Sequence, residues 1–287
     1  MKTKRIPFLL TVVIIAFTFL NVSCKKNKND APMPDPVVTG VQLTNNTKFG
    51  TIITDNLGQS LYFFADDVDG TSACNGQCLT FWPIFYKDNL TIGAGANAAD
   101  FGVITRADGL KQNTFRGWPL YYFKNDASAG DTNGDGVDST WFIGKTDYTV
   151  MMGHKQLVGE DGAQYKSNGT AGTEISRYIT DPGGRTLYLF TRDTYKTNKF
   201  STNDPAHDGN WPIDSVKAIA SIPSILDKTQ FELITVFGTT QLVYKGRPLY
   251  HFGKDARLRG NTKGVSFPTP GLAIWKIINS TTAPLTQ

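Results

Sequence analysis

The side chains best suited to hold a metal ion lie in the segment 131–138, which reads DTNGDGVD. Their oxygens alternate along the chain and a glycine follows. This pattern matches the opening of a calcium loop, because hard cations gather carboxylate and amide oxygens. The candidate ligands are Asp131, Asn133, Asp135 and Asp138. Phe142 stands where such a loop closes with glutamate, and the matching segment 261–265 has lost the acids. Calcium binding is one hypothesis for this loop, and a polar, glycine-rich turn is the other.

Two closely spaced cysteines, Cys74 and Cys78, are the second candidate for chemistry. In an exported protein such a pair most often forms a disulfide. A zinc site would need a second cysteine pair or a histidine pair nearby, and the sequence has neither. We expect a structural disulfide that pins a turn. The alternatives are a redox-active pair, whose disulfide would be accessible and easily reduced, and two free thiols.

Three histidines, His154, His207 and His251, are the remaining reactive side chains. His207 lies between aspartates that could bind a metal with it, but an exposed loop explains this segment more simply. His251 occupies a variable position of a predicted strand. The common catalytic and nucleotide-binding motifs are absent from the sequence. We therefore predict no catalytic residue, and a hydrolase with an unrecognised site is kept as an alternative function.

The first residues of the chain are typical of an export signal. Positive charges precede an apolar run at 7–20, which is too short to span a bilayer and fits a signal peptide. Ser23 stands directly before Cys24, as in a bacterial lipobox, although Asn21 replaces the usual leucine. We expect a signal peptide at 1–23 and acyl chains such as palmitate on Cys24, which would anchor the protein to a membrane. The polar and proline-rich stretch that follows predicts a flexible tether over 24–45.

The charge balance argues against a nucleic-acid partner. The formal net charge is +4, and Lys2, Lys4 and Arg5 of the signal supply three of these charges, which leaves the rest of the chain near +1. Nucleic-acid binding needs a clustered basic face. The expected partners are instead the membrane, through the lipid anchor, and an unidentified envelope ligand or protein.

One pattern organises the body of the chain. The motif Leu-Tyr-x-Phe-x-x-Asp occurs four times, with spacings of 59, 67 and 62 residues between successive tyrosines. Its repeated residues are Tyr62, Phe64, Asp67, Tyr121, Phe123, Asp126, Tyr188, Phe190, Asp193, Tyr250, Phe252 and Asp255. The first and third copies follow a turn, whereas the second and fourth follow a segment with glycine and proline. The larger repeating unit therefore holds two copies.

The motif predicts a short strand that ends in a turn. It is rich in β-formers and lacks a helical period, so its Tyr and Phe should share one face, with the Asp bonded to nearby backbone amides. We expect an all-β or strongly β-dominated protein of two tandem domains, at 46–158 and 175–282, joined by a linker at 159–174. One closed, propeller-like assembly of four modules is the alternative.

The repeat resembles the "secreted repeat of unknown function" lipoproteins, which are recognised by a Tyr-x-aromatic-x-x-Asp motif. The segments 72–83 (SACNGQCLTFWP) and 106–135 carry the closest similarity. The resemblance implies a lipoprotein of the bacterial cell envelope, with the outer membrane as its expected location, and brings no assigned reaction. We therefore expect a non-catalytic binding or structural module, with a redox- or calcium-linked envelope protein as the main alternative.

The tryptophans offer one further test of a binding role. They recur at repeat positions, as Trp82, Trp118, Trp141, Trp211 and Trp275. If they were exposed in a row, they could form a platform for a glycan or another small ligand. If they are buried, they belong to the core.

Overall fold

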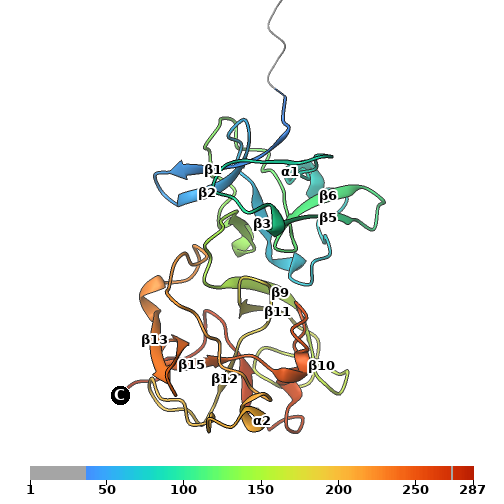
Figure 1. Ribbon diagram of the computed structural model, residues 1–287. Coiled ribbons are helices and arrows are strands. Elements are labelled where there is room, and N and C mark those ends of the chain that lie inside the picture. The colour runs from blue at the N-terminus through green and yellow to red at the C-terminus, as the bar shows by residue number, and fades with distance from the viewer. Residues whose placement is uncertain (1–36, 273) are drawn as a thin grey trace, which may run out of the picture. The chain divides into compact units, whose positions relative to one another are not determined.

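Short β-rich segments separated by glycine, asparagine and aspartate fold into small, mostly antiparallel sheets in this protein (Figure 1). The computed structural model describes residues 37–272 and 274–287, and Val37–Gln287 forms one compact unit. The predicted signal peptide, Cys24 and most of the predicted tether lie outside the described residues. Within the described part, no helix is long and apolar enough to cross a membrane.

The first part of the unit contains three small sheets. In the first sheet, β1 (Gly40–Asn46) pairs antiparallel with β2 (Gly50–Asp55) and parallel with β4 (Thr91–Ile92). In the second, the motif strand β3 (Tyr62–Phe64) pairs with β8 (Trp141–Ile143). The third holds β5 (Phe101–Thr105), β6 (Lys111–Phe115) and β7 (Trp118–Pro119). The short helices are α1 (Cys78–Phe81) and the 3-10 turns Ala65–Asp67, Ala98–Asp100 and Val137–Ser139.

The second part contains two sheets. β9 (Met151–Val158) lies between β10 (Gln164–Tyr165) and β11 (Ile175–Thr180). The five-stranded sheet has the order β13 (Phe231–Val236), β14 (Thr239–Tyr244), β15 (Arg247–Tyr250), β12 (Tyr188–Phe190) and β16 (Trp275–Ile277). The short helices are α2 (Pro205–Asp208) and the 3-10 turns Lys228–Gln230, Gly253–Asp255 and Lys263–Ser266.

The strand-dominated fold class is confirmed, whereas the propeller-like alternative is wrong. Strands are numerous, α-helices are few, and the described residues form several small sheets with no closed barrel or propeller. The motif strands are only three or four residues long, and the second copy pairs only through isolated bridges at Tyr121, so the motifs do not build the four-stranded blades of a propeller.

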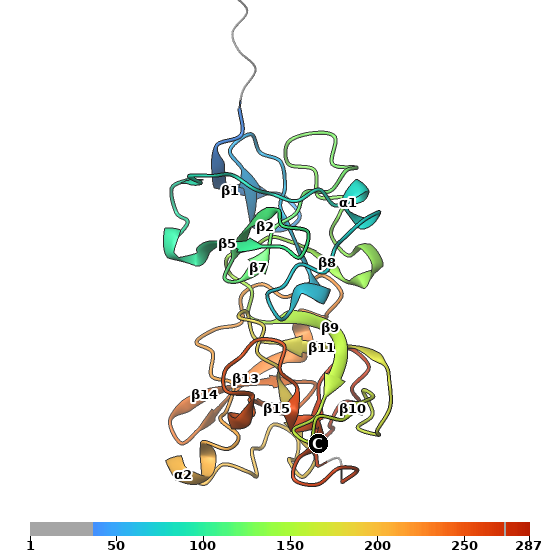
Figure 2. The same ribbon diagram turned by 90° about the vertical axis from the view of Figure 1, so that its right-hand side faces the viewer.

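The strand pairing also shows what the segment 159–174 does. β9 precedes it, β11 follows it, and these two strands pair along six residues. Figures 1 and 2 show the two strands side by side. The segment contains β10, which pairs with β9. It is thus the connection of a long hairpin, and β9 packs with the strands that follow it in the chain.

The motif residues lie at the centre of the packing. All four motif leucines and all four motif tyrosines are fully buried. The predicted alternation along the strand holds for the first copy, because Tyr62 and Phe64 belong to one aromatic cluster with Trp82 and Trp141, while Phe63 faces a different part of the core. Burial of this much aromatic surface explains why such short strands are held in place.

Candidate functional site

The two motif copies in the first part of the chain hydrogen-bond to each other. The Tyr62 hydroxyl donates to Asp126 Oδ2 at 2.6 Å, and the Tyr121 hydroxyl donates to Asp67 Oδ2 at 2.7 Å. Each tyrosine therefore binds the aspartate of the other copy rather than its own. Such bonds to a buried carboxylate are stronger than bonds between neutral groups.

The third and fourth copies make the same exchange. The Tyr188 hydroxyl donates to Asp255 Oδ2 at 2.7 Å, and the Tyr250 hydroxyl donates to Asp193 Oδ2 at 2.9 Å. The Tyr and the Asp of one copy thus take part in two different hydrogen-bonded pairs. The fixed spacing between them within the motif therefore has a structural reason. Burial raises the pKa of all four tyrosines.

The second oxygen of each motif aspartate accepts a backbone amide. The donors are the amides of Ala73, Lys199, Asn133 and Lys263, at 2.6–2.9 Å. Burial, which disfavours the charged form, raises the pKa of Asp67 to about 7 and those of Asp193 and Asp255 to about 6. Burial also raises the pKa of Asp126. Perturbed carboxyl groups can mark active sites, but here all four are fixed in structural pairs.

The predicted calcium loop is part of this architecture. The amides of Asn133 and Gly134 donate to Asp126 and to the Tyr62 hydroxyl. A side chain at Gly134 would meet the rings of Tyr62 and Trp82 at 2.9 Å, so the loop packs directly on the pair. In the second part, Lys263 and Gly264 make the same contacts to Asp255 and Tyr188 without any acid in the loop.

The acidic side chains of this loop do not converge on one point. Asp131 Oδ2 accepts the amide of Ser128, and Asp135 Oδ1 accepts the amide of Ile143, both at 2.9 Å. Among the described residues, no group of three or more His, Cys, Asp or Glu side chains is placed to hold a metal ion. Calcium binding by Asp131, Asn133, Asp135 and Asp138 stays a prediction, and in this structure Asp131 and Asp135 accept hydrogen bonds from backbone amides.

The expected disulfide between Cys74 and Cys78 is present, with the two Cα atoms 5.4 Å apart. Cys74 is buried, and its carbonyl oxygen accepts a hydrogen bond of 2.8 Å from the buried Arg106 guanidinium. Arg106 also binds the side chains of Asn75 and Ser72. The bridge thus closes a loop that Arg106 holds through hydrogen bonds to Ser72, Cys74 and Asn75.

The five tryptophans are all buried, so they do not form an exposed platform. Trp82 and Trp141 stack with ring centroids 3.7 Å apart, and Trp211 and Trp275 stack at 3.6 Å. Each stack lies beside a Tyr–Asp pair, since Tyr62 packs on Trp82 and Tyr188 packs on Trp211, in both cases edge to face. The tryptophans therefore belong to the core.

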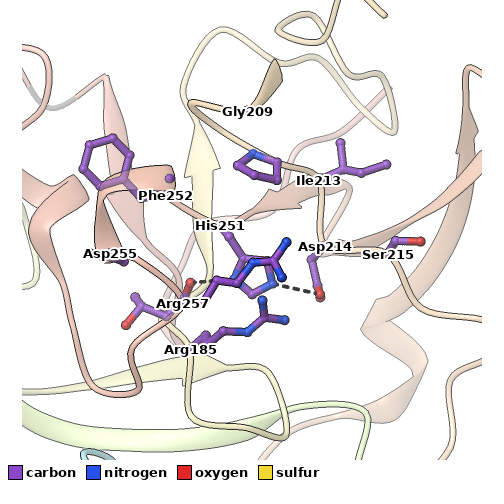
Figure 3. A pocket seen from close by; sticks show the side chains of 12 residues that line it. Arg185, Gly209, Ile213, Asp214, Ser215, His251, Phe252, Asp255 and Arg257 are labelled. Atoms are coloured by element: carbon purple, nitrogen blue, oxygen red, sulfur yellow. Dashed lines mark hydrogen bonds and ion pairs between the residues drawn. The ribbon is translucent and has the colours of Figure 1, made fainter. Parts of the chain in front are cut away.

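A pocket of about 430 Å³ opens beside the fourth motif copy, at His251 (Figure 3). His251 Nε2 lies 3.3 Å from Asp214 Oδ1, and its Nδ1 lies 3.3 Å from the carbonyl oxygen of Thr186. The approach to Asp214 is not aligned as a hydrogen bond. His251 Nε2 and Asp214 Oδ2 are both buried, and neither has a hydrogen-bond partner among the described residues.

The same place in the first part of the chain is filled by two aromatic side chains, and the hydroxyl of one of them, Tyr122, donates to Asp55 Oδ2 at 3.0 Å. Phe85 follows Trp-Pro-Ile as Asp214 does, and the two residues make equivalent backbone bonds, to Leu120 and to Leu249. Tyr122 takes the motif position of His251 and packs edge to face on Phe85, with ring centroids 5.7 Å apart. The second part of the chain has thus replaced a packed aromatic pair with an ionisable one.

Two arginines complete the pocket wall. Figure 3 shows the side chains of Arg185 and Arg257 beside His251. Arg185 Nε donates to Asp181 Oδ2 at 2.5 Å, whereas Arg257 is exposed and forms no ion pair within residues 37–272 and 274–287. Asp255 also lines the pocket, but Tyr188 and Lys263 occupy its oxygens. The open space is therefore bordered by two guanidinium groups and by the side chains of His251 and Asp214.

Sequence reasoning found only part of this site. It placed His251 at a variable strand position and gave Asp214 no role, although a comparison of Trp-Pro-Ile-Phe with Trp-Pro-Ile-Asp would have revealed the exchange. The other histidines lie elsewhere: His154 contacts Asp66 at 2.6 Å, and His207 contacts Asp208 at 2.8 Å. The structure therefore does not gather the three histidines into one site.

Comparison with known proteins agrees with the repeat read from the sequence. No curated protein and no solved structure matches the chain. The family described as "Secreted repeat of unknown function" matches twice, over residues 43–86 and 102–145, and its description agrees with export. The first match contains Tyr62 and Asp67, and the second contains Tyr121 and Asp126. These two segments are therefore copies of the secreted repeat of unknown function, which confirms the family that the motif indicated.

Proposed function

We propose that this protein is an exported, lipid-anchored binding module of the bacterial cell envelope, held at the outer membrane. Cys24 carries the lipid, the residues between Cys24 and the compact unit that begins at Val37 act as the tether, and the body consists of two tandem repeat domains. The lipobox-like sequence supports the anchor. The two matching sets of crossed Tyr–Asp pairs support the tandem organisation.

We infer that the second domain contains the ligand pocket, at His251. The observation that carries this inference is the replacement of the packed pair Phe85 and Tyr122 by Asp214 and His251 at the same positions of the fold. A buried polar atom without a partner costs about 1–3 kcal/mol. Stability alone would favour the aromatic pair, and sites that depart from good packing in this way are typically functional.

The pocket suits a small anion that carries a carboxylate or a phosphate. A volume of about 430 Å³ is within the range of small-molecule sites. Arg257 is exposed on its wall, and Arg185 presents the part of its guanidinium that Asp181 does not occupy. Guanidinium groups bind carboxylates and phosphates through paired hydrogen bonds. Asp214 and His251 form the ionisable wall behind them.

Titration of the chain 25–287 with succinate and with inorganic phosphate, followed by calorimetry, tests this proposal. We expect one of these anions to bind, and Arg257→Gln to weaken its binding on the order of tenfold. The exposed Arg192→Gln is the matched control and should leave the affinity unchanged. The double variant Asp214→Phe, His251→Tyr restores the residues of the first domain and should fold but not bind.

Two results would overturn the binding proposal. One is the absence of binding by both anions to the wild-type chain. The other is equal loss of affinity in Arg257→Gln and Arg192→Gln, which would show that the anion responds to overall charge rather than to the pocket.

A further inference from the structure

The hairpin between β13 and β14 ends in a conformation that its residues do not favour. Val236 and Thr239 pair across the tip, which leaves Phe237 and Gly238 as a two-residue turn with φ of +47° and +81°. Positive φ at both positions is typical of a type I′ turn, which prefers Asn, Asp or Gly. A bulky side chain with positive φ is uncommon and strained. The Phe237 side chain is also 60% exposed, so it gains little from burial.

Other turns of this kind use their side chains to hold the structure. Arg116, with φ of +47°, donates to Asp100 and to the carbonyl of Thr146. Lys245, with φ of +53°, donates to the carbonyls of Ser280 and Thr282. Phe237 packs on no other aromatic ring among the described residues. Phe237 therefore has a strained backbone and an exposed apolar side chain. It has neither the hydrogen bonds of the other turn residues nor aromatic packing to offset them.

The corresponding hairpin tip of the first domain is built as expected for a structural turn. This tip is one residue longer, since the Arg106 amide donates to the Leu110 carbonyl and leaves Ala107, Asp108 and Gly109 between them, and only Gly109 has positive φ. Asp108 accepts hydrogen bonds from Arg106 and from the amide of Leu110. The short, strained tip with an exposed phenylalanine is thus a feature of the second domain, which also contains the His251 pocket.

Phe237 borders a groove of about 350 Å³ that has both apolar and polar walls. The other apolar residues are Pro205, Pro212, Ile213 and Val236, and the polar side chains are those of Ser201, Asn203, Asp208 and Thr239. The side chains of Asn203 and Thr239 make no hydrogen bonds within the described part of the chain. The groove shares Gly209, Pro212 and Ile213 with the His251 pocket. The strained turn and the exposed ring of Phe237 do not involve that pocket.

We infer that this groove binds a saccharide, one ring of which lies against the face of Phe237. A pyranose ring presents C–H groups on one face and hydroxyls around its edge, so it matches an aromatic face with polar side chains beside it. The hydroxyls would pair with Asn203 and Thr239. An apolar protein segment fits less well, because it would cover these polar groups without giving them partners.

Saccharide binding is tested on the chain 25–287 with maltotriose, cellotriose, chitotriose and xylotriose, by saturation-transfer NMR and titration. We expect at least one to bind, and Phe237→Asn to weaken that binding on the order of tenfold. Phe237→Tyr keeps an aromatic face and should retain binding. Leu258→Asn, at another exposed apolar residue, is the control and should not change it.

The same variant separates a binding role from a structural one. Asn suits a type I′ turn, so Phe237→Asn should raise the melting temperature by about 2 °C while binding is lost. A fall in melting temperature would show that Phe237 stabilises the fold and would overturn the inference. So would the failure of all four trisaccharides to bind. Neither result bears on anion binding at Arg257, which is measured with different ligands.

Discussion

The Tyr62 hydroxyl donates a 2.6 Å hydrogen bond to Asp126 Oδ2, 64 residues further along the chain. The return bond, from Tyr121 to Asp67, spans 54 residues. The two motif copies are therefore joined by a reciprocal pair of hydrogen bonds. The same arrangement recurs in the second part of the chain, where Tyr188 binds Asp255 and Tyr250 binds Asp193. We call these two reciprocal Tyr–Asp hydrogen bonds a clasp. Each motif copy supplies one Tyr and one Asp to it, so the clasp forms only when two copies fold against each other.

Removal of one clasp hydroxyl should destabilise the protein without changing its packed volume. Tyr62→Phe leaves Asp126 without its buried donor, so the free energy of unfolding should fall by about 1–3 kcal/mol. Urea denaturation measures the change. Tyr86→Phe is the matched control, because the Tyr86 hydroxyl makes only an exposed 3.3 Å contact with Asp88. Equal effects of the two substitutions would contradict the role given to the clasp.

The motif aspartates should make stability depend on pH. Burial raises the pKa of Asp67 from 3.8 to about 7, so the folded protein holds a proton there that the unfolded chain releases near pH 4. Its contribution is complete below pH 4 and is lost as pH rises through about 7. Melting temperatures between pH 4 and 8 should therefore decline more in the wild type than in Asp67→Asn, which cannot ionise. Parallel curves for the two proteins would refute this assignment.

The disulfide should contribute modestly, because it closes a small loop. Replacement of both cysteines, Cys74→Ser with Cys78→Ser, should lower the free energy of unfolding by about 2 kcal/mol or less. Arg106 still holds Ser72 and Asn75 in the variant, so the fold should persist. Circular dichroism and urea denaturation check both statements. Unfolding of the variant under native conditions would show that the loop depends on the bridge rather than on the arginine.

The proposed anchor predicts a change of location when Cys24 is replaced. Full-length Cys24→Ser cannot be acylated at this position, so the protein should move from the membrane fraction to the soluble or cell-associated precursor fraction. Metabolic labelling with a palmitate analogue should mark the wild type alone. Cys78→Ser is the control and should remain labelled and membrane-bound. Labelling of Cys24→Ser would place the lipid elsewhere.

The sequence by itself determined the local and repeated features of this protein. Four copies of one motif predicted short strands, and the structure places all four motif tyrosines at strand residues or an isolated bridge. The close spacing of Cys74 and Cys78 predicted their disulfide, and the motif identified the family. These features could be predicted because side-chain alternation, turn preference and a five-residue disulfide loop depend on neighbours in the chain.

Only the tertiary structure decided which distant side chains meet. The crossed Tyr–Asp pairs and the burial of the tryptophans both follow from how long loops close. The contact between Asp214 and His251 is of the same kind, since it joins two residues that lie 37 positions apart in the chain. Composition and residue spacing do not encode these contacts between distant side chains, because each contact depends on the packing of the whole core around it.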